Sequence, residues 1–372
     1  MPSADDSGAG HAEPSLHHLI EAYLDCRRTK RNSASALAFE VDLERNLVEL
    51  HDELAGGRYR PGRSICFVIT RPRPREVWAA AFRDRIVHHL LYRRVAPAIE
   101  ASFIADSCAC IPGRGTLYAA RRLEAKVRSA SENWSRPLWY LKADIANFFV
   151  SIDKRILDEL LAGRIREPWW LALARLVLWH DPRVDVDVRG DPRRLALVPP
   201  HKRLVNQSAD FGLPIGNLSS QFFANVYLDQ LDRFVKHELR ARHYIRYVDD
   251  LVLLHESPQQ LNTWRAAIAV FLPARLGLEL NPRKTILQPV ARGVDFVGQV
   301  IRPWRRTIRR RTFHEALARV GALAPEDVHQ SVNSYFGLLR QASHSHGDRA
   351  RLANLVRRRG HSVDRLLTKA KE

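Results

Sequence analysis

Residues 244–254, YIRYVDDLVLL, place two adjacent aspartates, Asp249 and Asp250, inside an otherwise apolar run. The β-branched, aromatic and aliphatic residues on either side predict two short strands joined by a turn at Asp249-Asp250. Burying one carboxylate without a partner is costly, and burying two side by side adds repulsion between like charges. Two explanations are open: the pair is solvated at an exposed hairpin tip, or strongly positive groups bind it.

The composition describes a folded and strongly basic protein. The chain has 372 residues, of which 45% are hydrophobic, so it can bury a core and form about two or three subdomains. Its 59 lysines and arginines exceed its 41 aspartates and glutamates, which gives a formal net charge of +18. An excess of this size predicts a polyanionic partner, of which nucleic acid is the simplest.

We expect a cytoplasmic protein that does not enter a membrane. Cys108 and Cys110 are close in sequence, but no second pair of this kind accompanies them, which disfavours a zinc site. The sequence contains neither the apolar segment of a secretion signal nor a run of the ~18 apolar residues that a membrane span requires.

Hydrophobic periodicity predicts an α+β fold with at least one antiparallel strand pair. Residues 1–13 are small and polar and predict a disordered tail, whereas residues 14–56 predict helices that end at Gly56-Gly57. Residues 181–211 lack periodicity and predict a long loop with room for a hairpin. We expect further elements, with Ser219 or Ser220 as one N-cap, in this order: strands at 65–69 and near Pro72 and Pro74, a helix at 82–100, a strand ending at 144, a helix at 219–240, a helix at 257–275, a strand pair at 294–301, and basic C-terminal helices.

A third carboxylate occurs in a similar setting. Asp144 ends the apolar, strand-like run WYLKAD. If this strand lies beside the hairpin of Asp249 and Asp250, three carboxylates converge at one end of a sheet. Divalent cations neutralise such a set, and oxygen ligands favour Mg²⁺ or Mn²⁺ over zinc. Two Mg²⁺ ions in such a site support nucleotidyl transfer.

Six segments resemble, in order, the motifs of reverse transcriptases. The similarity spans about residues 20–345 and implies a right-hand polymerase with fingers at 14–135, an antiparallel-sheet palm at 136–302 and a basic helical thumb at 303–372. The segments are PRPREVWAAAFRDRIVHH (72–89), DIANFFVSID (144–153), GLPIGNLSSQFFANVYLDQLD (212–232), YVDD (247–250), NPRKT (281–285) and FVGQVI (296–301).

The segment IGNLSSQ points to a subtype. Many bacterial reverse transcriptases place a glutamine before the glycine of this motif and end it in Ser-Pro. Here Ile215 precedes Gly216 and the motif ends in Ser220-Gln221. This form resembles the reverse transcriptases of diversity-generating retroelements. The resemblance implies a structured noncoding RNA, a small basic accessory protein, and errors concentrated at template adenines.

The resemblance also implies roles for the acidic motifs. Asp144, Asp249 and Asp250 hold two Mg²⁺ ions, with the backbone oxygen of Ile145 as a further ligand. Lys284 protonates the leaving pyrophosphate or only neutralises phosphate.

Other matched residues are expected to bind the nucleotide and the nucleic acid. Arg75, Ile215, Gly216 and Gln221 are expected at the incoming dNTP. Of Phe148 and Phe149, one is expected in the core and the other to exclude the ribose 2′-hydroxyl. Phe149 is the one that matches the excluding position in the family. Phe296 and Gly298 are expected to grip the primer end. Contacts to the RNA backbone are expected from Arg83, Arg85, Arg93, Arg94, Arg305, Arg306 and Arg309–Arg311, with Trp304 stacking on a base or capping a core.

Three functions are therefore open. The first is a diversity-generating reverse transcriptase that copies a template RNA into mutated cDNA. The second is a stand-alone bacterial reverse transcriptase of antiphage defence with its own noncoding RNA. The third is a catalytically silent RNA-binding scaffold, which the four matched residues Asp144, Asp249, Asp250 and Lys284 disfavour.

Overall fold

A computed structural model describes residues 13–28, 33–71 and 73–371. The predicted disordered tail, residues 1–13, lies outside the described residues except for Glu13. The chain forms two compact units, each built from separate stretches of sequence. The first unit contains residues 1–104, 145–234 and 269–280, and the second contains residues 105–144, 235–268 and 281–372.

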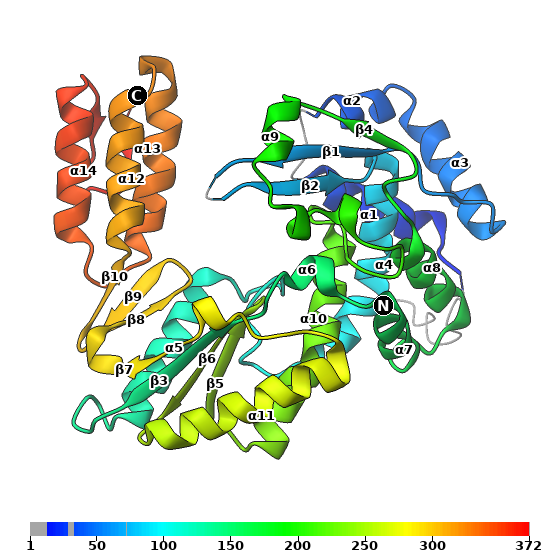
Figure 1. Ribbon diagram of the computed structural model, residues 1–372. Coiled ribbons are helices and arrows are strands. Elements are labelled where there is room, and N and C mark those ends of the chain that lie inside the picture. The colour runs from blue at the N-terminus through cyan, green and yellow to red at the C-terminus, as the bar shows by residue number, and fades with distance from the viewer. Residues whose placement is uncertain (1–12, 29–32, 72, 372) are drawn as a thin grey trace, which may run out of the picture. The chain divides into compact units, whose positions relative to one another are not determined.

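The first unit is mainly helical, with one small sheet (Figure 1). Helix α4 is its central element: Ile86, Leu90 and Leu91 are almost fully buried, and α1, α2, α8 and α10 all contact it. The helices are α1 (Leu16–Arg27), α2 (Ala34–Glu40), α3 (Leu43–Ala55), α4 (Phe82–Ala101), α6 (Phe148–Ser151), α7 (Lys154–Ala162), α8 (Pro168–Trp179), α9 (Pro192–Ala196) and α10 (Leu218–Arg233).

The sheet of the first unit has the order β2-β1-β4, with β1 (Ser64–Ile69) in the centre. Strand β2 (Arg75–Ala79) pairs antiparallel with β1 and lies at an edge, as the neighbouring prolines predict. Strand β4 (Val186–Val188) pairs parallel with β1. The hairpin considered for residues 181–211 is therefore wrong: this stretch contains one strand, helix α9 and two 3₁₀ turns.

Helix α10 begins earlier than predicted. Asn217, with extended backbone, is the N-cap residue, whereas Ser219 and Ser220 are buried in the first turn. The prediction of Ser219 or Ser220 as the N-cap is wrong, because the helix starts before them, directly after Asn217. The side chain of Asn217 accepts a hydrogen bond from the N–H of Ala80. The helix ends at Arg233 and continues as a π-helical segment, Phe234–Glu238, instead of reaching residue 240 as an α-helix.

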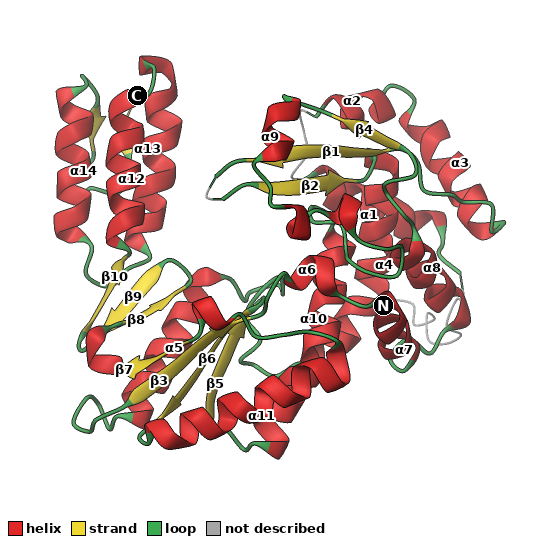
Figure 2. Ribbon diagram, viewed as in Figure 1, coloured by secondary structure: helices red, strands yellow, loops and turns green. Residues whose placement is uncertain are grey.

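The second unit is built on a four-stranded antiparallel sheet (Figure 2). Its order is β5-β6-β3-β7, so the two motif-bearing strands β6 and β3 are neighbours at its centre. The strands are β5 (His243–Tyr247), β6 (Asp250–His255), β3 (Trp139–Asp144) and β7 (Ile286–Pro289). Asp250 is the first residue of β6, so the turn predicted at Asp249-Asp250 lies instead at Val248-Asp249.

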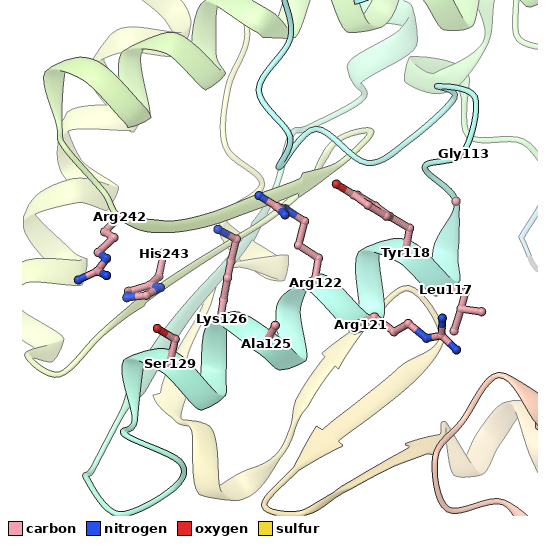
Figure 3. Close-up of a pocket in the computed structure, with 11 residues that line it drawn as sticks. Gly113, Leu117, Tyr118, Arg121, Arg122, Ala125, Lys126, Ser129, Arg242 and His243 are labelled. Atoms are coloured by element: carbon pink, nitrogen blue, oxygen red, sulfur yellow. The ribbon is translucent and has the colours of Figure 1, made fainter. Parts of the chain in front are cut away.

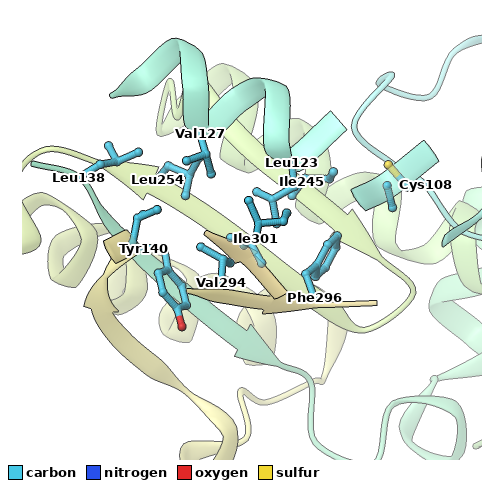
Figure 4. Close-up of a cluster of buried hydrophobic side chains, with 13 residues drawn as sticks. Cys108, Leu123, Val127, Leu138, Tyr140, Ile245, Leu254, Val294, Phe296 and Ile301 are labelled. Atoms are coloured by element: carbon cyan, nitrogen blue, oxygen red, sulfur yellow. The ribbon is translucent and has the colours of Figure 1, made fainter. Parts of the chain in front are cut away.

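Helix α5 (Thr116–Ala130) and a second sheet pack with the four-stranded sheet and complete this core of the second unit. The second sheet has the order β10-β9-β8 and consists of β8 (Val294–Phe296), β9 (Gln299–Arg302) and β10 (Arg305–Ile308). Figure 4 shows Leu123 and Val127 of α5 above Ile245, Val294 and Ile301 of the strands. Residues 105–135 therefore pack with the predicted palm sheet, although the sequence assigned them to the fingers.

The C-terminal residues form a helical bundle with its own core, as the sequence predicts. Val320, Val332 and Phe336 are fully buried in it. Its elements are α12 (Arg310–Ala322), α13 (Pro325–Arg340), α14 (His346–Arg358), β11 (Ser362–Val363) and β12 (Ala370–Lys371). Helix α11 (Pro258–Leu276) precedes the bundle in the chain and is not part of it.

Mixed helices and antiparallel sheets confirm the α+β prediction. Within residues 13–28, 33–71 and 73–371, no helix combines the length and the hydropathy that crossing a membrane requires.

Candidate active site

The three predicted carboxylates meet at one end of the sheet of the second unit. Strands β3 and β6 pair in a register that sets Asp144 directly opposite Asp250. Asp249 lies in the turn immediately before Asp250. Like charges that face each other across two strands destabilise a sheet, so this register needs positive charge nearby.

The turn that carries Asp249 has an unusual backbone. Val248 has φ +55°, a left-handed conformation that a β-branched residue rarely adopts. The buried side chain of Arg246 supports it: Nη1 donates to the Val248 oxygen at 3.0 Å, and Nη2 donates to Ser107 Oγ at 2.9 Å. Arg246 thus fixes the turn from inside the protein.

Burial and the neighbouring negative charges make Asp249 and Asp250 difficult to ionise. Burial, followed by the charges of Asp144 and Asp250, raises the pKa of Asp249 to about 6. Burial also raises the pKa of Asp250, while the charge of Lys142 opposes this shift. The cluster therefore favours any arrangement that brings a cation to it.

Two lysines already supply positive charge to the cluster. Lys284 Nζ lies 2.7 Å from both Asp144 oxygens, and Lys142 Nζ lies 3.8 Å from Asp250 Oδ2. Asn281 accompanies Lys284: its backbone N–H donates to the Asp144 backbone oxygen at 2.7 Å. Lysine and asparagine therefore hold Asp144 from the NPRKT segment.

The chemistry of the donor atoms suits a divalent cation, although their arrangement does not form a closed metal site. Among the described residues, no group of three or more His, Cys, Asp or Glu side chains is gathered closely enough to hold a metal ion. The chemistry of the carboxylates nevertheless suits Mg²⁺, because they offer oxygen ligands and carry negative charge that burial makes costly. A cation that binds Asp144 through both oxygens has to displace the ammonium of Lys284.

Ile145 and the predicted nucleotide-binding residues belong to the first unit. Ile145 is buried and forms an isolated β-bridge with Leu280. Arg75 is exposed at the start of β2. Phe148 is buried and Phe149 is half-buried, with their ring centroids 5.2 Å apart. One phenylalanine is therefore a core residue and the other reaches the surface in part.

The IGN segment is attached to strand β2. The Trp78 N–H donates to the Ile215 oxygen at 2.7 Å, and the Ala80 N–H donates to Asn217 Oδ1 at 3.1 Å. Gly216 lies between these bonds with φ +129°, and a Cβ placed there would come within 2.8 Å of the Trp78 oxygen. Only glycine fits this position, whereas Ile215 is half-buried and Gln221 is exposed on α10.

The predicted RNA-binding arginines of α4 have protein partners. Arg83 pairs with Glu53, Arg93 with Glu21 at 2.8 Å, and Arg94 with Glu167 at 2.8 Å. Arg85 Nε donates to the Ala80 oxygen at 2.9 Å, and burial lowers its pKa. In this conformation, ion pairs within the first unit occupy the basic face that the sequence assigned to RNA.

Of the residues predicted to grip the primer or to belong to the thumb, some are buried and others are exposed. Phe296 is fully buried in the core, and Gly298, with φ +85°, follows it by two residues; that the two grip the primer end stays a prediction. Arg306 is also buried and lies 3.7 Å from Glu124. Arg305 is exposed.

Arg309 pairs with Asp295, and Arg311 with Glu315 at 2.7 Å. Trp304 is 63% exposed, so it does not cap a core.

Three residues at the cluster were missed from sequence: Lys142, Arg246 and Asn281. A signal existed for Lys142, which precedes Asp144 by two residues and therefore lies on the same face of the strand. A signal also existed for Arg246, a charged residue inside an apolar strand.

A family comparison agrees with this geometry. Residues 72–301, more than half of the chain, match the family model "Reverse transcriptase (RNA-dependent DNA polymerase)". The chain belongs to the reverse transcriptase family. This reverse transcriptase is accordingly an enzyme of the RNA-directed DNA polymerase class.

Its similarity to individual proteins is distant. It is 23% identical over 325 residues to Protein YkfC of Escherichia coli (strain K12), covering 78% of each chain. It is 25% identical over 182 residues to an uncharacterized 91 kDa protein in the cob intron of Schizosaccharomyces pombe, covering 48% of this reverse transcriptase and 19% of that protein.

A solved structure shares the fold. The telomerase of Candida albicans, solved with a TWJ fragment of telomeric RNA, superposes with a TM-score of 0.51 at 12% sequence identity. The match covers 81% of this reverse transcriptase but only 55% of the telomerase chain. At this identity the likeness concerns the fold alone, and it agrees with the right-hand polymerase architecture.

Proposed function

We propose that this protein copies a structured template RNA into cDNA by two-metal nucleotidyl transfer, as the polymerase of a diversity-generating retroelement. The observation that carries the catalytic part is the register that sets Asp144 opposite Asp250, with Asp249 in the adjoining turn. A structural role alone does not account for three carboxylates at a place where burial, followed by the charges of Asp144 and Asp250, raises the pKa of Asp249.

Each residue of the cluster has a task in this mechanism. Asp144, Asp249 and Asp250 would hold two Mg²⁺ ions, or Mn²⁺, through oxygen atoms. When bound, these ions would supply activation of the primer 3′-hydroxyl and stabilisation of the leaving pyrophosphate. Lys284, released from Asp144, is free to donate a proton from Nζ to the pyrophosphate, and Lys142 continues to balance the charge of Asp250.

Residues of the first unit select the nucleotide. The half-buried ring of Phe149 offers neither space nor a hydrogen bond to a ribose 2′-hydroxyl, so it favours dNTPs. The exposed guanidinium of Arg75 suits stacking and phosphate contact at the incoming nucleotide. Gln221, exposed on α10, and the backbone of Gly216 complete this set.

Ile215 supports the diversity-generating subtype. Its backbone oxygen is held by Trp78, so the position of its side chain follows from that of strand β2. An aliphatic side chain offers no hydrogen bond to the nascent base pair, and polar contacts are what give large discrimination. We therefore expect an error-prone enzyme whose errors fall mainly opposite template adenines. A small basic accessory protein and a structured noncoding RNA belong to the same proposal, as does a cytoplasmic location.

The test is primer extension on a defined RNA template with Mg²⁺ and dNTPs, followed by sequencing of the product. The variant Asp249→Ala/Asp250→Ala should lose extension. Its matched control, Asp185→Ala/Asp187→Ala, removes two exposed carboxylates of the loop that contains β4 and should retain it. Extension that survives in the first variant would contradict the catalytic assignment.

The error spectrum tests the subtype. Wild-type cDNA should carry substitutions concentrated at template adenines, and Ile215→Gln should reduce them. Faithful wild-type extension would favour the stand-alone reverse transcriptase of antiphage defence instead. No extension, even with cellular RNA and partner proteins present, would favour an RNA-binding scaffold.

A further inference from the structure

A basic cavity lies on the outer side of helix α5, within the second unit. Its volume is about 770 Å³, and Figure 3 shows its wall formed by α5 and by the start of strand β5. The side chains that give it chemical character are those of Tyr118, Arg121, Arg122, Lys126, Arg242 and His243. No acidic residue occurs among the described residues that line it.

Helix α5 has two distinct faces that explain the cavity. Ala119, Leu123 and Val127 are fully buried against the sheet. Tyr118, Arg122 and Lys126, each one residue before a member of that set, leave the helix on one common side (Figure 3). Spacing of four residues places side chains above one another on a helix, so the second face presents one aromatic and two cationic groups in a row.

The positive charge of the cavity is only partly compensated. Asp106 is the carboxylate behind it, and it pairs with Arg122, with Lys126 at 2.9 Å, and with Lys236 at 3.8 Å. Three cations thus share one carboxylate. Burial, followed by the charges of Lys126, Arg242 and Lys236, lowers the pKa of His243 to about 4, so His243 is neutral at physiological pH.

Two arginines at the cavity are available to a ligand. Arg121 and Arg242 are exposed, and among the described residues neither side chain has a hydrogen bond or an ion pair. By contrast, Arg83, Arg93 and Arg94 of the first unit are paired with carboxylates. These three arginines of the first unit are therefore neutralised, whereas the cavity, to which no motif drew attention, retains free positive charge.

The cavity is separate from the catalytic carboxylates. His243 pairs with Leu254 at one end of the β5-β6 hairpin, whereas Tyr247 pairs with Asp250 at the other. The four residue-to-residue steps from His243 to Tyr247 correspond to roughly 13 Å of strand. A ligand in the cavity therefore does not occupy the site of nucleotide transfer.

We propose that this cavity binds the phosphodiester backbone of a single-stranded segment of RNA that is not being copied. Arg121, Arg122, Lys126 and Arg242 contact the phosphates, and the ring of Tyr118 lies beside the strand, where an unstacked base can pack against it. The net charge of +18 favours a nucleic acid over an acidic protein as the occupant. Such contacts position an RNA without reading its sequence.

The inference rests on the proposed function only in taking RNA as the partner, and its test involves no catalysis. Fluorescently labelled oligouridine is titrated with the full-length protein in EDTA, without primer or dNTPs, over a series of salt concentrations. The variant is Arg121→Glu/Arg242→Glu. Its matched control is Arg265→Glu/Arg275→Glu, which makes the same change of charge on two exposed α11 arginines.

We expect the cavity variant to bind oligouridine about tenfold more weakly than the control, because two arginines no longer reach the phosphates. The slope of log affinity against log salt should decrease by roughly 1 for each phosphate that the variant no longer neutralises. Crosslinking of 4-thiouridine RNA to wild type should label the α5 peptide that contains Tyr118. Equal affinities and slopes for the two variants would overturn the proposal and leave an acidic protein as the candidate occupant.

Competition separates a strand from a single nucleotide. Uridine monophosphate at the same phosphate concentration should not displace oligouridine from the cavity, the part of its binding that the Arg121→Glu/Arg242→Glu variant loses. Displacement would overturn the proposal in favour of a mononucleotide site. No primer extension, even with cellular RNA and partner proteins present, together with cavity-dependent binding would refute the proposed function and leave this inference standing.

Discussion

The ammonium of Lys284 lies 2.7 Å from both carboxylate oxygens of Asp144. The lysine occupies the coordination positions that a divalent cation would take on this carboxylate. The ion pair and a metal bound through both oxygens would therefore be alternatives at Asp144, and in the proposed mechanism Lys284 would act on phosphate only after such a metal had replaced it.

Replacing Lys284 by methionine separates these two roles. Lys284→Met should bind Mg²⁺ at least as tightly as wild type, because no ammonium competes for Asp144. Extension should nevertheless fall by about 10²-fold or more, as for loss of a general acid. The Mg²⁺-dependent thermal shift and single-turnover extension measure the two effects. Lys202→Met, at an exposed lysine of the first unit, is the control. A smaller Mg²⁺ shift in Lys284→Met would contradict competition at Asp144.

Asp249 should make stability depend on pH. Its pKa in the folded protein is raised to about 6, so the folded state binds a proton more tightly than the unfolded chain. Protonated Asp249 therefore contributes to the free energy of unfolding. This contribution is fully present below the unfolded pKa of roughly 4 and is lost as pH rises through the folded pKa of about 6.

Asp249→Asn removes this dependence. Without metal, the gain in melting temperature of the variant over wild type should be larger at pH 8 than at pH 4. Thermal unfolding in EDTA at the two pH values measures it, and Asp295→Asn serves as a control at a carboxylate paired with Arg309. An equal gain at both pH values would show that Asp249 is not difficult to ionise.

Phe149 should decide between deoxyribonucleotides and ribonucleotides. Phe149→Ala opens the space that the ring fills, so incorporation of rNTPs should rise relative to dNTPs while the carboxylates stay in place. The measurement is the ratio of kcat/KM for dNTP and rNTP in single-nucleotide extension. Phe148→Leu, a change in the adjacent core residue, should reduce stability without altering that ratio. Equal ratios for wild type and Phe149→Ala would remove Phe149 from sugar selection.

Gly216→Ala should destabilise the first unit by roughly 2 kcal/mol or more, because alanine resists a φ of +129° and its Cβ would meet the Trp78 oxygen. Chemical denaturation measures the loss. Gly337→Ala is the matched control: this glycine lies in α13 with open space around it, so alanine should stabilise the helix by about 0.5–1 kcal/mol. Similar effects of the two substitutions would refute the packing argument.

Much of the site could be predicted because it lies in local patterns. Short runs of apolar, β-branched and aromatic residues identify β3, β5 and β6, and pairing of adjacent strands then brings Asp144 to Asp250. The turn was misplaced by one residue because Val248 adopts a backbone conformation that valine rarely takes. Propensity predicts the common conformation of a residue, whereas here Arg246 stabilises an uncommon one.

Long-range contacts explain other features of the structure that the sequence alone did not show. Each of Arg83, Arg93 and Arg94 looks free in sequence, because its carboxylate partner is at least 30 residues away. Phe296 belongs to a segment predicted to grip the primer end, and the packing of β8 and β9 against α5 turns its ring inward, which the segment itself does not reveal. Asn217 replaced the serines as N-cap because its side chain bonds to Ala80, which local sequence does not reveal.

The interleaving of the two units limits how this protein can be divided. Six successive stretches of chain alternate between the units, so neither unit corresponds to one continuous piece of the gene. A fragment that ends at any of the five junctions leaves part of a core without its partner strands or helices. A truncated chain that loses activity will therefore have lost it because it does not fold, and deletions will not reveal which residues act in function. Point substitutions are the way to learn the roles of individual residues.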